Sequence, residues 1–289
     1  MSLLDIKLHK PKSVEEALEL LGELEDARLV AGGTDLLVDI KQGLVTNKNL
    51  VSLQDVQSLK GIWKEEGKIH VGAMVTPNDI QSDGLISQHV HALSEAARSM
   101  AATQISSMAT IGGNIASAVP SADMPPPLIA ADASVVLECG TSREVGLAEF
   151  FTGVRETVCG AGEVLVSVWI PIPPARTGSS YQKLALREAN ALAVVGVASQ
   201  ISLLGDKIER ANIVLGAVAP TPVLALKASE FLCGQIPSES LFDEAASLAT
   251  QTAKPISDIR GSAWYRKELI PILTRRSLEV AWERAQERS

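Results

Sequence analysis

Aromatic residues are scarce in this sequence of 289 residues, where they make up only 3%. Proteins that bind single-stranded nucleic acids stack bases on aromatic rings, and proteins that bind duplexes neutralise phosphates with Lys and Arg. Here acidic residues exceed basic ones, 34 against 26, and the formal net charge is −8. We therefore expect no nucleic acid among the partners of this chain.

Cysteine and long apolar runs are also rare. The three cysteines are widely spaced and include no C-x-x-C pair, the spacing of zinc ribbons and iron–sulfur sites: Cys139, Cys159 and Cys233. This usage predicts free thiols in a reducing compartment, with the cytoplasm as the default location. The start of the chain has no secretory signal pattern. Apolar runs such as Ala191–Ala198 are far shorter than the roughly 20 residues of a membrane helix, so we predict no membrane span.

Patterns for catalysis and metal binding are missing as well. The four histidines show no metal-ligand spacing: His9, His70, His89 and His91. The sequence contains neither the G-x-G-x-x-G of a Rossmann domain nor the G-x-x-x-x-G-K-[ST] of a P-loop. We predict no catalytic residue and no metal ligand on this chain.

Periodicity and capping signals nevertheless predict regular structure up to about residue 172. The first helix is expected to start at a capping box of Ser13 and Glu16. A second start signal is Thr76 followed by Pro77, a good N-cap before a residue suited to the first helical turn. The expected helices are 13–22, 34–43 (with Thr34 as N-cap), 76–82 and 86–100, and the expected strands are 28–31, 68–76, 133–138 and 163–172.

The segment 171–180 is rich in Pro, Gly and Ser and predicts a domain boundary. Beyond it, strands come first and helices follow, which is typical of a separate α+β domain. Gly205 and Asp206 mark a hairpin turn between the second and third strands. The expected strands are 181–186, 191–204 and 207–219, and the expected helices are 222–234, 239–253 and 262–287.

Two glycine-rich turns carry the main signal for function. The first is "LVAGGTDLL" (29–37) and the second is "ATIGGNIAS" (109–117). Glycine accepts a positive φ and lets a ligand approach the backbone closely, and successive amides in such a turn bind anions. Together the two turns could hold the two phosphates of a dinucleotide. Taken alone, either glycine pair more often marks a tight turn that binds nothing.

The longer strings around these turns are more specific: "RLVAGGTDLLVDIKQG" and "QISSMATIGGNIASAVPSADMPPPLIAADASVVL". They strongly resemble the FAD-binding medium subunit of the molybdenum hydroxylase family, which includes xanthine dehydrogenase and aerobic carbon monoxide dehydrogenase. The resemblance continues through Leu147–Pro173 and Tyr181–Ala198 and covers nearly the whole chain, more weakly in the last helices.

The resemblance implies an α+β fold in two parts. An FAD-binding domain of the p-cresol methylhydroxylase type would span 1–176, with two α/β subdomains at about 1–57 and 58–176. A C-terminal domain with a three-stranded antiparallel sheet and helices would span 177–289. The boundary drawn from composition agrees with this division.

The resemblance also implies a binding site for FAD. The first turn would wrap the diphosphate, with the amides of Gly32, Gly33 and Thr34 closest, and the second turn would complete the clamp. Asp123 would lie beside the cofactor, while Leu165 and Lys183 would line the flavin or its chain. The implied cofactor-binding residues are Leu29, Val30, Ala31, Gly32, Gly33, Thr34, Asp35, Leu36, Met100, Thr110, Ile111, Gly112, Gly113, Asn114, Asp123, Leu165 and Lys183.

Plainer interpretations of single residues stay open. Asp35 is an ordinary residue for the start of a helix. Asp123 suits an Asx turn, and Lys183 suits an exposed position on a strand. No histidine lies at either turn, which favours FAD held without a covalent bond.

As a member of this family, the chain would be an oxidoreductase subunit that transfers electrons. It would pass them from [2Fe-2S] clusters on a small partner subunit, through FAD, to an external acceptor. The molybdenum cofactor would lie on a large partner subunit, in an (αβγ)2 hexamer. Two alternatives stay open: a self-contained flavin-dependent oxidase, and a non-enzymatic scaffold subunit.

Overall fold

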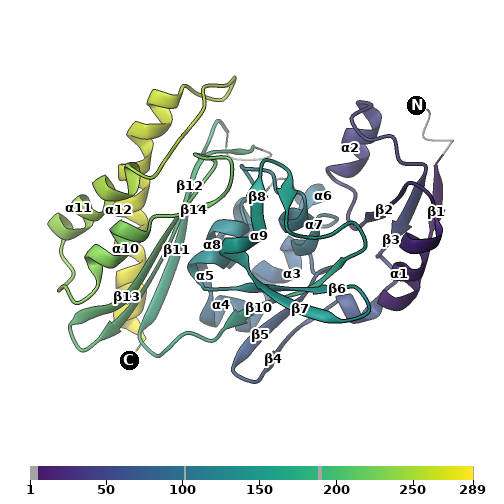
Figure 1. Ribbon diagram of the computed structural model, residues 1–289. Coiled ribbons are helices and arrows are strands. Elements are labelled where there is room, and N and C mark those ends of the chain that lie inside the picture. The colour runs from purple at the N-terminus through teal and green to yellow at the C-terminus, as the bar shows by residue number, and fades with distance from the viewer. Residues whose placement is uncertain (1–5, 101, 188–190, 289) are drawn as a thin grey trace.

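A computed structural model of the chain describes residues 6–100, 102–187 and 191–288. Three larger sheets follow one another along the chain, one N-terminal, one central and one C-terminal (Figure 1). Within the described ranges, no helix has the length and apolar character needed to span a membrane.

The N-terminal sheet is parallel and has the order β1-β3-β2. Parallel neighbours need crossover connections, and the two helices of this region provide them. The last strand, β3, enters between the first two and pairs with both. The elements are β1 (Lys7–His9), α1 (Val14–Glu23), β2 (Ala27–Val30), α2 (Leu36–Lys41) and β3 (Asn49–Ser52).

The central sheet has the order β4-β5-β10-β6-β7, and all its pairings are antiparallel. β10, the latest of these strands in the chain, is its middle strand and joins β5 to β6. Before the sheet comes the 3-10 helix η2 (Gln57–Leu59). The strands are β4 (Ile62–Glu65), β5 (Lys68–Gly72), β6 (Ser134–Glu138), β7 (Ser142–Gly146) and β10 (Val164–Pro171).

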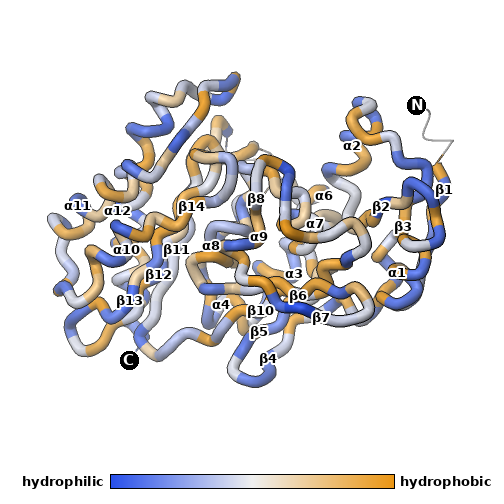
Figure 2. The backbone as a smooth tube through the Cα atoms, viewed as in Figure 1, coloured by the Kyte–Doolittle hydropathy of each residue, from blue (hydrophilic) through white to orange (hydrophobic). Residues whose placement is uncertain are grey.

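Along the chain, short helices and a small hairpin connect the strands of the central sheet. The hydrophobic residues of β6 lie in the middle of the molecule, in a core shared with these helices (Figure 2). The elements are α3 (Pro77–Ser82), α4 (Gly84–His89), α5 (His91–Ser99), α6 (Thr103–Ser106), α7 (Ile111–Ala116), α8 (Pro125–Ala130), α9 (Leu147–Phe150), β8 (Phe151–Gly153) and β9 (Glu156–Thr157).

The C-terminal sheet is antiparallel and has the order β11-β12-β13-β14. Its outer face is covered by α10, α11 and α12, and α5 and α8 pack against its other face (Figure 1). The elements are β11 (Thr177–Ala185), β12 (Ala193–Leu204), β13 (Lys207–Gly216), β14 (Val223–Leu224), α10 (Leu226–Leu232), α11 (Glu239–Thr250) and α12 (Ala263–Glu287).

Strand β12 shows why the apolar run of this region is almost continuous. A strand covered on both faces has no solvent side, so apolar residues do not alternate with polar ones. Val195 and Val197 belong to the core formed with α10–α12. Ala198 belongs to the core of the central region, together with Tyr181 and Val214. The C-terminal sheet therefore joins the two cores.

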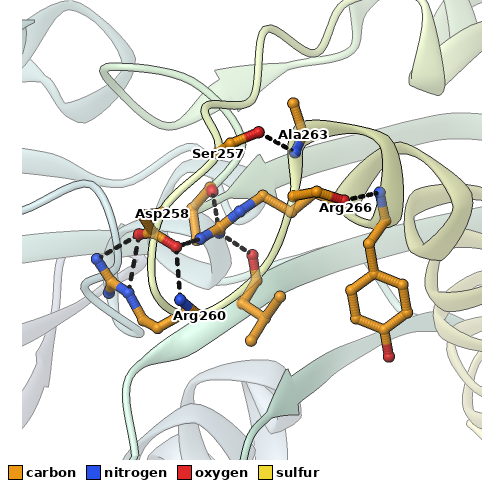
Figure 3. Close-up of polar contacts among 9 residues, drawn as sticks. Ser257, Asp258, Arg260, Ala263 and Arg266 are labelled. Carbon is orange, nitrogen blue, oxygen red and sulfur yellow. Dashed lines mark hydrogen bonds and ion pairs between the residues drawn. The ribbon is translucent and has the colours of Figure 1, made fainter.

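Arg266 ties the start of α12 to the sheet (Figure 3). Its side chain is almost fully buried and donates hydrogen bonds to the carbonyl oxygens of Val194 and Ala217. A third contact is an ion pair of 2.7 Å with Asp258, which also binds Arg260. A buried guanidinium needs such partners because an unpaired buried charge is costly. The loop before α12 is thereby held to the ends of β12 and β13.

Several predicted helix starts are confirmed. The Ser13 hydroxyl accepts from the Glu16 amide, although the Glu16 carboxylate accepts from the Lys12 amide rather than completing the capping box. Thr76 and Asp79 form a complete capping box at α3. The antiparallel C-terminal sheet and its helices are also as predicted, with β14 as a short fourth strand.

Many boundaries differ from the sequence prediction. β11 begins at Thr177 rather than Tyr181, and β5 ends at Gly72 rather than Thr76. α1 continues through Gly22 to Glu23, and α2 begins after Asp35 rather than Thr34. The helix expected at 222–234 starts only at Leu226, because Val223 and Leu224 pair with β13.

A larger difference is the helix expected at 86–100, which is two helices. α4 ends at His89, and Val90 has a non-helical backbone between it and α5. The Ser179 hydroxyl of β11 accepts from the Ala92 amide in the first turn of α5. A contact with a distant strand therefore satisfies an N–H group at the new helix start.

Candidate functional site

The first glycine turn lies between β2 and α2. Gly33 has a φ of +70°, a conformation that glycine adopts without strain. Gly32 is packed so closely that a Cβ atom added to it would overlap the carbonyl oxygen of Met108. Because Met108 precedes the second glycine turn directly, the structure brings the two turns together, as the sequence predicted.

Three backbone amides of the first turn are free. Among the hydrogen bonds of the described residues, none has the amide of Gly32, Gly33 or Thr34 as its donor. All three residues are only partly buried. Buried or half-buried amides are normally paired, and successive free N–H groups in a turn form a site for an anion. The first turn therefore fits a phosphate group.

In the second glycine turn, the amides of residues 111–114 are bonded within the protein. Thr110 is the N-cap of α7, and its hydroxyl accepts from the Gly113 amide at 3.1 Å. The amides of Ile111 and Gly112 donate to the carbonyl oxygens of Val75 and Ala73, each at 2.9 Å. The Asn114 amide donates to the Thr110 carbonyl, also at 2.9 Å. The same Gly-Gly motif thus serves here to dock a helix on the central region.

The Asn114 side chain is the open polar group of the second turn. Its Nδ2 lies 3.8 Å from the Sδ of Met100, so the structure also brings Met100 to the site. Its Oδ1 is buried and has no hydrogen-bond partner among the described residues. An unpaired buried acceptor is costly, and a donor on a bound ligand would remove that cost.

Asp123 and Lys183 form a buried ion pair at the carbonyl of Ser99, the residue before Met100. The Lys183 Nζ lies 2.8 Å from Asp123 Oδ2 and donates to the Ser99 carbonyl at 3.1 Å. Both side chains are less than a tenth exposed. The interpretation of Lys183 as an exposed strand residue is therefore wrong. The Asp123 carboxylate is likewise bound by distant side chains, Lys183 and Tyr181, rather than by a local Asx turn.

Burial governs protonation in this cluster. Removal from water raises the pKa of Asp123, and the charge of Lys183 and the hydrogen bonds from Lys183 and Tyr181 oppose that rise. Burial and the neighbouring carboxylate raise the pKa of Tyr181 well above its usual value. The phenol therefore stays protonated and donates to Asp123.

The remaining predicted residues have mostly structural surroundings. Asp35 is exposed, and its side chain makes no capping bond to α2. Leu165, on β10, is buried in the same core as Ile111. The flanks of the first turn pack in the two cores of the N-terminal region: Leu29, Val30, Ala31 and Leu36. Their contribution to cofactor binding stays a prediction.

Two further residues were not among the predicted set. Tyr181 lies two positions before Lys183 on β11, and its hydroxyl donates to Asp123 Oδ1 at 2.8 Å. The period of a strand places such residues on the same face, so this spacing could have identified it. Arg155 forms an ion pair of 2.7 Å with Asp39 of α2. Its amide donates to the carbonyl of Ala118, which follows α7 in the chain. No local pattern predicts that contact.

Two family models match the chain. The FAD binding domain in molybdopterin dehydrogenase matches residues 4–173, and the CO dehydrogenase flavoprotein C-terminal domain matches residues 179–281. Among curated proteins, the carbon monoxide dehydrogenase medium chain of Afipia carboxidovorans is 35% identical over 96% of this chain and 97% of its own length. The glyceraldehyde dehydrogenase medium chain of Sulfolobus acidocaldarius is 30% identical over 94% and 97%.

Solved structures agree with these matches. A carbon monoxide dehydrogenase chain from Hydrogenophaga pseudoflava superposes with a TM-score of 0.94 at 34% identity, covering 98% of this chain and 99% of that one. A chain of quinoline 2-oxidoreductase from Pseudomonas putida 86 gives a TM-score of 0.92 at 33% identity, with 99% of both chains covered. The chain therefore belongs to the family of FAD-binding medium subunits of molybdenum hydroxylases, the family of carbon monoxide and xanthine dehydrogenases.

Proposed function

We propose that this subunit takes electrons from [2Fe-2S] clusters of a partner subunit and passes them through FAD to an external acceptor. The observation that carries the proposal is the contact between the two glycine turns, with three free amides on one turn and an unpaired acceptor on the other. Such a site holds a dinucleotide through its backbone and needs no acid or base for a substrate.

Each part of the site has a separate role in this proposal. The amides of Gly32, Gly33 and Thr34 bind the diphosphate, and Asn114 Oδ1 accepts a hydrogen bond from the cofactor. The Lys183–Asp123 pair, held at the Ser99 carbonyl, would place a fixed charge on the wall of the site. When bound without a covalent link, FAD supplies the redox chemistry, and the protein positions it and adjusts its electrostatic surroundings.

The partners follow from the family. Several relatives are subunits of larger enzymes. Examples are the medium chain of carbon monoxide dehydrogenase and subunit alpha of the 6-hydroxypseudooxynicotine dehydrogenase complex. We expect a large molybdenum subunit and a small [2Fe-2S] subunit, assembled as (αβγ)2. The loop before α12 and the first turn of that helix support a contact with one of them. They expose Ile256, Ile259 and Trp264, and Arg266 holds the loop against the sheet. Exposed apolar clusters of this kind mark protein contacts.

Two further expectations belong to the proposal. We divide the chain into an FAD-binding domain at 1–176, with subdomains at about 1–57 and 58–176, and a C-terminal domain at 177–289. Strand β11 begins at Thr177, which is consistent with that division. The cytoplasmic location stays a prediction.

The test uses the full chain purified with its partner subunits. Heat should release FAD, and the bound flavin should be reduced when the partner's clusters are reduced first. Flavin reduction by a substrate added to the isolated chain would instead favour a self-contained oxidase. A chain that shows no flavin absorbance even after FAD is added would favour a scaffold.

A further inference from the structure

Tyr181 lies on β11 of the C-terminal sheet and contacts the Asp123–Lys183 pair through Asp123. Its hydroxyl donates to Asp123 Oδ1 at 2.8 Å, while Lys183 binds the other carboxylate oxygen at the same distance. Tyr181 is 6% exposed and Asp123 is 5% exposed. The phenol and the ammonium therefore hold the carboxylate from two directions, without competing water.

Gly196 makes room for this arrangement. It lies opposite Lys183 in the pairing of β11 with β12. A Cβ atom at this position would lie 2.6 Å from the Tyr181 hydroxyl and 3.2 Å from the ring. Only glycine leaves the phenol in its place against Asp123. This accounts for a glycine in the middle of a buried strand, where it otherwise weakens the sheet.

The backbone of Tyr181 is fixed from the other side. Its amide donates to Glu95 Oε2 of α5 at 2.7 Å, and Glu95 also pairs with Arg284 of α12 at 2.6 Å. Lys183 is the charged group bound to the Asp123 carboxylate, while Glu95 and its partner Arg284 lie at the backbone amide of Tyr181. Tyr181 is anchored to both helices that enclose β11, so its ring has a defined position.

We propose that Tyr181 is a positioning residue of the FAD site: it orients the Asp123 carboxylate, and Asp123 in turn holds the Lys183 ammonium against the Ser99 carbonyl beside Met100. The inference rests on the proposed function, since it takes this cluster to be a wall of that site. Through Tyr181, the C-terminal sheet controls a charge at the cofactor.

The inference predicts that FAD binding depends on pH. The ion pair that anchors Lys183 exists while Asp123 is ionised. This anchor is lost as the pH falls through the pKa of the Asp123 carboxyl. A hydrogen bond from the phenol stabilises the ionised form, so its removal raises the pKa of Asp123 further. In Tyr181→Phe the anchor is therefore lost at a higher pH than in the unchanged protein.

The experiment measures FAD retention by the assembled complex from neutral to acid pH. Tyr181→Phe should raise the FAD dissociation constant about tenfold at neutral pH and move the acid limb of the curve toward neutrality. Tyr265→Phe is the matched control, because Tyr265 is the only other tyrosine and the residue is 41% exposed. Its curve should coincide with that of the unchanged protein.

Gly196→Ala provides an independent variant, because its methyl group displaces the phenol while Tyr181 is kept. It should shift the acid limb in the same direction. In an Asp123→Asn background, Tyr181→Phe should cause no further shift. Coincident curves for Tyr181→Phe and the unchanged protein would overturn the inference. An unchanged protein that retains no FAD at any pH would instead overturn the proposed function.

Discussion

The two glycine turns look alike in the sequence but differ in what their amides do. In the first turn, Gly32, Gly33 and Thr34 donate to no group of the described protein. In the second, the amides of residues 111–114 are bonded to Val75, Ala73 and Thr110. One turn is therefore open to an anion, and the other is a helix start built into the core. The two Gly-Gly motifs lie in contact in the fold, but the hydrogen-bond partners of their amides give the two turns different roles.

Gly32→Val should have the largest effect, because its side chain would overlap the Met108 carbonyl and separate the two turns. We expect loss of bound FAD and a fall of about 3 kcal/mol in the free energy of unfolding. Flavin content and denaturant unfolding measure both.

Gly22→Ala is the matched control for that variant, since a Cβ on Gly22 meets no atom within 4 Å and the residue lies inside α1. Its FAD content should be unchanged, and its stability should rise by up to about 1 kcal/mol. Full FAD binding by Gly32→Val would mean that the turns need not touch.

Gly112→Ala should have a smaller effect and of a different kind. The new methyl carbon would lie 2.8 Å from the Ala73 carbonyl oxygen, so α7 must move away from the central region. We expect a loss of about 2 kcal/mol of stability, with FAD affinity reduced less than in Gly32→Val. Thermal unfolding at saturating FAD, compared with FAD titration, separates the two effects. Equal loss of affinity in both variants would remove the distinction between the turns.

Thr110→Val should have the smallest effect, because it keeps the shape of the side chain and removes only the cap of α7. The expected loss is about 1 kcal/mol of stability. Thr110→Ser keeps the hydroxyl and should restore most of it. A large drop in FAD affinity for Thr110→Val, with unchanged stability, would show that the hydroxyl binds the cofactor rather than the helix.

The sequence was a good guide wherever the signal was local. Thr76 with Pro77 located α3, and the two glycine strings located the site. The break at Val90 was not predictable, because the cap of α5 is Ser179 on a strand far along the chain. The partners of Asp123 were missed for the same reason, since Tyr181 and Lys183 reach it only through packing of the C-terminal sheet.

Amide hydrogen exchange, measured with and without FAD, tests the difference between the turns most directly. Without FAD, the amides of Gly32, Gly33 and Thr34 should exchange fast, and FAD should slow them strongly. The amides of Gly112 and Gly113 should already be slow without FAD and change little. If FAD leaves the first turn unprotected and protects only the second, the first turn is not the phosphate site, and our account of this subunit is wrong.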